Sequence, residues 1–177
     1  MQDFIDQAKK NGITLSHSGK CQLCGADTTR GIYECVSLYS IGFELLDFSK
    51  TENYISRFLC VDSHALQHPE IHGRWNNHFH LTRLHLILKL DYKWDYNKSP
   101  LLSKYLNVYK NDKNNEFLIP PKSTERGSIT TIDILNNAKT ESECKDLIYK
   151  WALIVYNSWT NYHNLVDIIA KGFIDKQ

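Results

Sequence analysis

The sequence lacks three features that would assign it to a broad class at once: a long apolar run, an excess of charge and an even set of cysteines. Its most apolar stretches, 84–90 and 151–156, are shorter than the roughly 20 apolar residues that a membrane-spanning helix needs. The formal net charge is +1, so no strong field attracts polyanions over a distance. Acidic Asp3 and Asp6 stand where a signal peptide would carry positive charge. We therefore expect no membrane segment, no export and a cytoplasmic protein.

Familiar catalytic motifs are also missing from the sequence. It contains no phosphate-cradling glycine loop, no nucleophile elbow and no pair of catalytic carboxylates at a recognised spacing. Its 177 residues, 42% of them hydrophobic, suffice for one domain with a buried core. Four Trp, ten Tyr and seven Phe supply side chains that could anchor a protein partner. The composition therefore favours a globular binding protein, although it does not identify the partner.

Two of the five cysteines are closely spaced, which is the strongest motif in the chain. Cys21 and Cys24 are separated by two residues and followed by Gly25. This spacing lets both thiolates face one tetrahedral ion, and the glycine permits the tight turn behind them. A redox pair would instead follow a strand that opens a βαβ unit, and no such strand is predicted here. We predict a zinc knuckle in a reducing compartment.

The missing ligands are expected among the histidines, because six of the eight lie between residues 64 and 85. His68 falls near the end of a helix predicted over 52–68, and His80 falls early in a helix predicted over 76–90. Antiparallel packing of these helices would bring the two imidazoles together. The predicted ligands of a single structural Zn²⁺ are Cys21, Cys24, His68 and His80.

Other cysteines and histidines have competing interpretations. Cys35 could take a ligand position because its helix begins just after the knuckle, and His64 could do so because it lies one turn before His68. Cys60 and Cys144 fit apolar helix faces, where a free cysteine is usually a small buried hydrophobe. Surface or hydrogen-bonded core positions are expected for His17, His72 and His163.

Apolar residues recur at helical spacing in most of the chain after the knuckle. Besides the two helices above, this pattern predicts helices over 31–49, 99–108 and 140–171. Thr140 and Glu143 match a capping box at the start of the last and longest of these. The polar segment 110–127, which contains Pro120-Pro121, is predicted to be a loop suited to docking or to closing as a lid.

These patterns predict an all-α fold of about six helices with the zinc knuckle docked on the helical core. The N-terminal segment with the knuckle spans 1–30, and the helical domain spans 31–177 as one structural unit. The knuckle is expected to dock against the second and third helices, and the long last helix to cross them.

Several of these residues, taken together, resemble a known family. The motifs are Cys21-x-x-Cys24-Gly25-Ala26, Cys35 before Leu38-Tyr39, Val61-Asp62-Ser63-His64-Ala65-Leu66-Gln67-His68-Pro69, and His80-Leu81. They are similar to an uncharacterised bacterial family, the domain-of-unknown-function family 5946. The resemblance continues through Pro120-Pro121, 127–133 and 151–159, although His64 stands where the family pattern has an aromatic residue. It implies that Cys21, Cys24, Cys35, Asp62, Gln67, His68 and His80 are motif positions, and it implies no activity.

The leading functional hypothesis is a zinc-stabilised helical module that binds a protein partner. Four protein ligands would leave zinc no position for water, whereas three would allow a zinc-dependent hydrolase near His68 and His80, with Asp62 or Glu70 as general base. A second alternative is nucleic-acid binding by basic residues around the knuckle, although whole helices separate the predicted ligands. A thiol switch that releases zinc on oxidation is a third.

Overall fold

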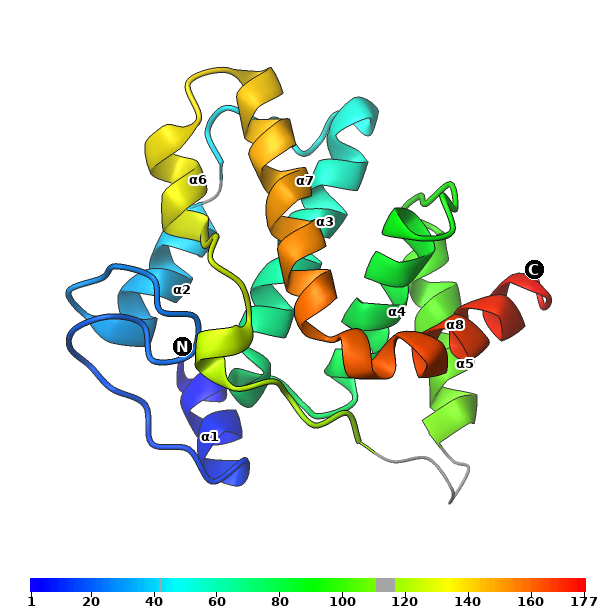
Figure 1. Cartoon of the computed structure of the whole chain (residues 1–177), viewed down its shortest axis with the longest axis horizontal. Helices are drawn as coiled ribbons and strands as arrows, with labels where there is room; N and C mark the ends of the chain where they lie inside the picture. Colours follow the sequence, from blue (N-terminus) through cyan, green and yellow to red (C-terminus); the bar gives the residue numbers. More distant parts are fainter. Residues whose placement is uncertain (42, 111–116) are drawn as a thin grey trace.

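The computed structural model describes residues 1–41, 43–110 and 117–177, and these residues form helices joined by turns and loops (Figure 1). The α-helices of the described chain are α1 (Gln2–Lys10), α2 (Gly31–Ile41), α3 (Tyr54–Gln67), α4 (Asn76–Leu88), α5 (Lys98–Lys110), α6 (Thr131–Asn137), α7 (Glu141–Ser158) and α8 (His163–Ile174). Single 3₁₀ turns are η1 (Thr51–Asn53), η2 (Pro69–Ile71), η3 (Ser123–Glu125) and η4 (Thr160–Tyr162). The predicted all-α class is confirmed, but these ranges contain more helices than the expected six.

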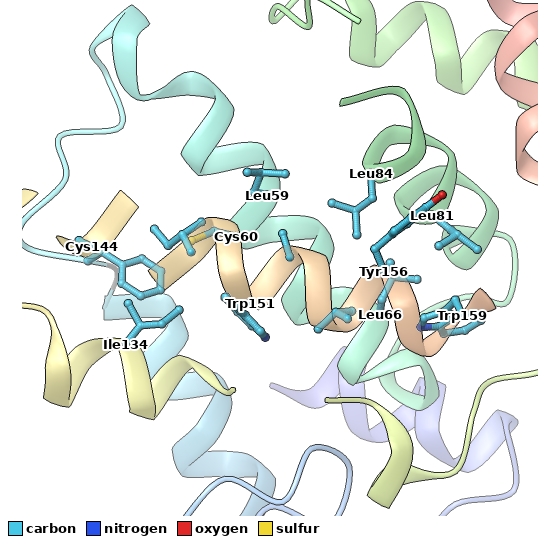
Figure 2. Close-up of a cluster of buried hydrophobic side chains, with 14 of the residues drawn as sticks. Leu59, Cys60, Leu66, Leu81, Leu84, Ile134, Cys144, Trp151, Tyr156 and Trp159 are labelled. Atoms are coloured by element: carbon cyan, nitrogen blue, oxygen red, sulfur yellow. The ribbon is translucent and has the colours of Figure 1, made fainter. Parts of the chain in front are cut away.

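Helix α3 lies at the centre of the fold. It packs against both α4 and α7, and α4 in turn packs against α8. Figure 2 shows the largest core, where side chains from α3, α4, α6 and α7 gather around Trp151, which is fully buried. Burying large apolar side chains of this kind contributes about 1.5–3 kcal/mol each. The end of α3, where His68 follows Gln67, is therefore held firmly by the core.

Two smaller apolar clusters flank this core. One lies between α4, α5 and α8 and includes Trp94 and Phe173. The other lies beneath the N-terminal loops and joins Ala8 of α1, Ile32 of α2 and Ile71 of η2. Cys21, Cys24 and Cys35 belong to the second cluster. The knuckle therefore packs against α1, α2 and η2 through the apolar residues of this cluster.

The predicted continuous helix over 140–171 is wrong, because the chain turns at Trp159. Helix α7 ends at Ser158, η4 follows, and α8 begins at His163 and packs against α4. The side chain of Trp159 is 1% exposed, so its burial fixes the turn at this point. Both α7 and α8 bury an apolar face, so the helical spacing of apolar residues continues across the break. The periodicity therefore does not reveal the bend.

The predicted capping box at the start of this helix is confirmed. The backbone N–H of Glu143 donates to the Thr140 hydroxyl over 3.2 Å, and the backbone N–H of Thr140 donates to the Glu143 carboxylate over 3.1 Å. These bonds satisfy two backbone donors that the first turn of a helix leaves free.

Other boundaries differ from the predictions. The helix predicted over 31–49 ends at Ile41, and the Asp47 carboxylate then accepts the backbone N–H of Ser49 in a turn. Helix α5 begins one residue early, at Lys98. Helix α6 was not predicted, although Thr130 and Asp133 form a capping box at its start. Within 110–127, Lys110 ends α5, residues 111–116 lie outside the described structure, and residues 117–127 form a loop with η3. None of the helices described has the length and apolar character to cross a membrane.

Candidate metal centre

The two closely spaced cysteines lie in a tight turn that points both thiols inward. The backbone N–H of Gly25 donates to the carbonyl of Cys21 over 2.7 Å, and the N–H of Cys21 donates to the carbonyl of Ala26 over 2.9 Å. Gly25 has a φ of 76°, a conformation that glycine adopts without strain. The knuckle geometry predicted for Cys21 and Cys24 is therefore present.

Pairing between Gly19 and the chain before α2 brings the third cysteine to the knuckle. The N–H of Gly31 donates to the carbonyl of Gly19 over 2.9 Å, and the Glu34 carboxylate accepts the N–H groups of Thr29 and Arg30. Gly31 itself has a φ of 58°. These contacts fix the direction in which α2 leaves the loop. They place Cys35, one turn into α2, directly behind the knuckle.

His68 completes the group from the end of α3. Its Nδ1 lies 2.7 Å from the backbone carbonyl of His64, which can only accept a hydrogen bond, so Nδ1 carries the proton. Its Nε2 lies 3.6 Å from the sulfur of Cys21 and 3.4 Å from that of Cys35. An imidazole oriented by a carbonyl at one nitrogen and free to ligate at the other is the usual arrangement at metal sites.

The four ligand atoms fit one tetrahedral ion. Those of Cys21, Cys24, Cys35 and His68 all lie within 4.8 Å of one another. Bonds of about 2.3 Å to sulfur and about 2.0 Å to nitrogen would separate sulfurs by ~3.8 Å and sulfur from nitrogen by ~3.5 Å. The Cys24 and Cys35 sulfurs are 3.7 Å apart, close to this value. The group could therefore hold a metal ion.

The burial and chemistry of the four side chains agree with this geometry. Each is at most 6% exposed, and each cysteine is a free thiol. Three thiolates with one imidazole form a soft donor set of the type found at structural zinc sites. We call these four residues the Cys3His group.

Protonation within the Cys3His group is shared. Hydrogen bonds from Cys24 and Cys35 lower the pKa of Cys21 far below its ordinary value, and hydrogen bonds with Cys21 and Cys24 raise that of Cys35. Burial acts to lower the pKa of His68, but the Cys24 charge and its hydrogen bonds with Cys21 raise it to about 10. A metal ion would displace the protons of this group, so its affinity should fall in acid.

His80, which the sequence analysis predicted as a ligand, lies outside the Cys3His group. Its Nδ1 lies 2.7 Å from Asp62, a fully buried carboxylate that also accepts two hydrogen bonds from Arg83. Asp62 precedes His68 by six residues on the same segment, about 9 Å along a helix axis. The contact with Asp62 thus places His80 beside the middle of α3, and Cys35 is the fourth member of the group at its end.

Among the other candidate residues, His64 lies outside the Cys3His group but stacks on His68, with ring centroids 4.2 Å apart. Cys60 and Cys144 are buried in the main core, as expected. His17 stacks on Tyr33 at the surface, and His163 contacts the backbone carbonyl of Tyr156.

Glu70, considered as a general base, is engaged in an ion pair that sequence reasoning missed. The Arg126 guanidinium donates to both Glu70 oxygens and also to the carbonyls of Leu23, Gln67 and Pro121. Arg126 is 3% exposed. It joins the knuckle, the end of α3, η2 and the segment before η3. No local sequence signal marks it, because its partners come from distant parts of the chain.

The comparisons with known proteins agree with the resemblance noted in the sequence. Residues 19–160, which include the whole Cys3His group, match the sequence model described as a family of unknown function (DUF5946). Searches of curated proteins and of solved structures gave no match. The match covers well over half of the chain, and the chain therefore belongs to the DUF5946 family.

Proposed function

We propose that the protein is a helical binding module whose N-terminal region is fixed by one structural Zn²⁺ at the Cys3His group. The observation that carries this proposal is the buried, compact grouping of three thiols and one imidazole, whose ligand atoms all lie within 4.8 Å of one another. In this proposal Cys21 and Cys24 of the knuckle, Cys35 of α2 and His68 after α3 are the four ligands. Zinc would tie together three segments that are distant in sequence and would supply folding free energy.

A closed ligand set argues against hydrolysis at this ion. Four protein ligands leave no position for a water molecule that zinc could activate. Glu70 is committed to Arg126, and Asp62 is committed to Arg83 and His80. The carboxylates near the group therefore have structural partners.

The partner-binding surface that we propose is the segment 117–122 and the groove of about 430 Å³ beside it. Within this segment Leu118 is buried, whereas Phe117 and Ile119 are 44% and 74% exposed. The Tyr162 hydroxyl accepts the N–H of Ile119, and Arg126 holds the carbonyl of Pro121. The two apolar side chains are thus presented on a fixed backbone, which lowers the entropic cost of binding.

Charge at the groove indicates the chemistry of the partner. Arg74 and Lys122 line it, and the acidic residue that lines it, Glu70, is already neutralised by Arg126. Lys122 also lies 3.9 Å from the exposed carboxylate of Glu125. Arg74 also lies 5.4 Å from the ring centroid of Phe117. A short apolar protein segment with acidic flanks would complement this surface.

The two parts of the proposal can be tested separately. Zinc content and cooperative unfolding of the Cys24→Ser variant test the structural centre, and both should be lost. For the surface, selection from a random peptide library should enrich apolar peptides with acidic flanks that bind the wild type and not Ile119→Asp. Ile168→Asp, at a 67% exposed position on α8, is the matched control. Peptides that bind all three proteins equally would refute the proposed surface.

A further inference from the structure

A second group of imidazoles surrounds a small cavity outside the Cys3His group. The cavity has a volume of about 150 Å³ and lies between α1, α2, α3 and the start of α4. His64, His72 and His80 line it, together with apolar side chains such as Phe4 and Val61. Neither the Cys3His group nor the proposed partner surface uses this cavity.

Two of the three imidazoles present a buried nitrogen that has no partner among the described residues. These atoms are the Nε2 of His64 and the Nε2 of His72. His64 is 4% exposed, and its ring is held between Tyr39 and His68 at centroid distances of 3.9 and 4.2 Å. Buried polar atoms are nearly always satisfied, so two on one cavity indicate a bound species.

The third imidazole is oriented by a carboxylate. Asp62 accepts two hydrogen bonds from Arg83, over 2.8 and 2.6 Å, and is therefore held as an acceptor only. The Nδ1 of His80, 2.7 Å from Asp62, must then carry the proton, which leaves the lone pair of Nε2 available. A carboxylate behind a histidine in this way is a recurrent outer-shell feature of metal ligands.

The environment also keeps the His72 imidazole neutral. Burial, helped by repulsion from His80 and His68, lowers the pKa of His72 to about 3. A neutral imidazole retains the lone pair that a metal ion requires, whereas a protonated one does not.

We propose that His64, His72 and His80 form a second, open site for a borderline divalent cation such as Zn²⁺ or Co²⁺. Asp62 is the outer-shell carboxylate of His80, and the remaining coordination positions face the cavity, where water or a small ligand fits. Three histidines with open positions form a known class of zinc site.

The geometry predicts that this site binds more weakly than the Cys3His group. Among the described residues only the Cys3His group has all its ligand atoms within 4.8 Å. The ring centroids of His72 and His80 are 6.4 Å apart, so these rings must turn inward around the ion. His64, fixed by stacking on both faces, is the stationary ligand.

The test is a Co²⁺ titration of the zinc-free full chain, followed by absorption spectroscopy and elemental analysis. Cobalt in the Cys3His group gives a sulfur-to-metal charge-transfer band, whereas cobalt bound by imidazoles gives d–d bands without one. We expect a first equivalent with the charge-transfer band and a second, weaker equivalent without it. If the first equivalent of cobalt gave no charge-transfer band, the proposed zinc centre would be refuted. The second site would still be tested by the d–d bands of cobalt bound to imidazoles.

Two variants test whether His72 and His80 bind the second equivalent of cobalt. His80→Asn keeps a donor to Asp62 but loses the ligating nitrogen, and His72→Ala removes a partly buried ring. Each should weaken the second equivalent by more than about 100-fold and leave the first unchanged, whereas the surface control His17→Ala should change neither. The unchanged charge-transfer band establishes that each variant is folded. A single equivalent in the wild type, or a second one that survives in both variants, would overturn the proposal.

Discussion

Arg126 is predicted to be the side chain outside the metal group on which the position of the knuckle depends most. Its guanidinium is 3% exposed and donates to the Glu70 carboxylate and to the carbonyls of Leu23, Gln67 and Pro121. Arg126→Met fills a similar volume but leaves a carboxylate and three carbonyls without a donor. Removing one partner of a buried ion pair costs about 3–5 kcal/mol. The Glu70 side chain is 16% exposed and can recover some hydration, so we expect the lower end of this range.

Urea unfolding of the metal-loaded chain measures this effect. Arg126→Met should lower the free energy of unfolding by about 3 kcal/mol, which corresponds to a fall in Tm of roughly 6–12 °C for a chain of this size. The double variant Arg126→Met, Glu70→Met should recover part of the loss, because it removes the uncompensated charge. Lys122→Met, at an exposed pair with Glu125, should change stability by less than about 0.5 kcal/mol. A loss below about 1 kcal/mol in Arg126→Met would refute the reasoning.

Three further perturbations test the local arguments. Gly31→Ala should lower the free energy of unfolding by about 2 kcal/mol, because φ is 58° and the new Cβ would lie 2.6 Å from the backbone oxygen of Ser16; an unchanged urea midpoint would contradict this. Trp151→Phe should cost about 2–3 kcal/mol in thermal unfolding, because it removes the 3.0 Å hydrogen bond to Gln67 and leaves a cavity; a loss of a few tenths would show that the bond contributes little. Burial lowers the pKa of His85 below 6.5, so the unfolded chain binds more protons as the pH falls through 6.5, and stability declines there by up to about 1.4 kcal/mol per pH unit. His85→Gln should flatten that decline, and an identical pH profile would exclude this contribution.

Some of the fold could be predicted because the governing interactions are local. Thr140 and Glu143 are three residues apart, so the sequence alone predicts their capping box, and both of its hydrogen bonds are present in the structure. The cysteine spacing of the knuckle is local in the same sense. By contrast, the bend at Trp159 depends on packing of α8 against α4, which a helical stripe along the chain does not encode.

The difference between the predicted ligand set and the Cys3His group has a similar physical origin. Sequence periodicity placed both helices correctly, but it could not fix how far α4 is shifted along α3. The turn η2 and the residues after it set that shift and bring His80 level with Asp62. The entry angle of α2, set by the pairing of Gly19 with Gly31, brings Cys35 inward instead. Both effects are tertiary, and neither has a local signature.

The central claim is that Cys35, and not His80, is the fourth ligand of the structural zinc ion. Counting tightly bound zinc tests it most directly. Elemental analysis after dialysis against a mild chelator should be made on the wild type, Cys35→Ser and His80→Ala in parallel. We predict one zinc per chain in the wild type and in His80→Ala, and none in Cys35→Ser. Zinc retained by Cys35→Ser and lost from His80→Ala would contradict the account.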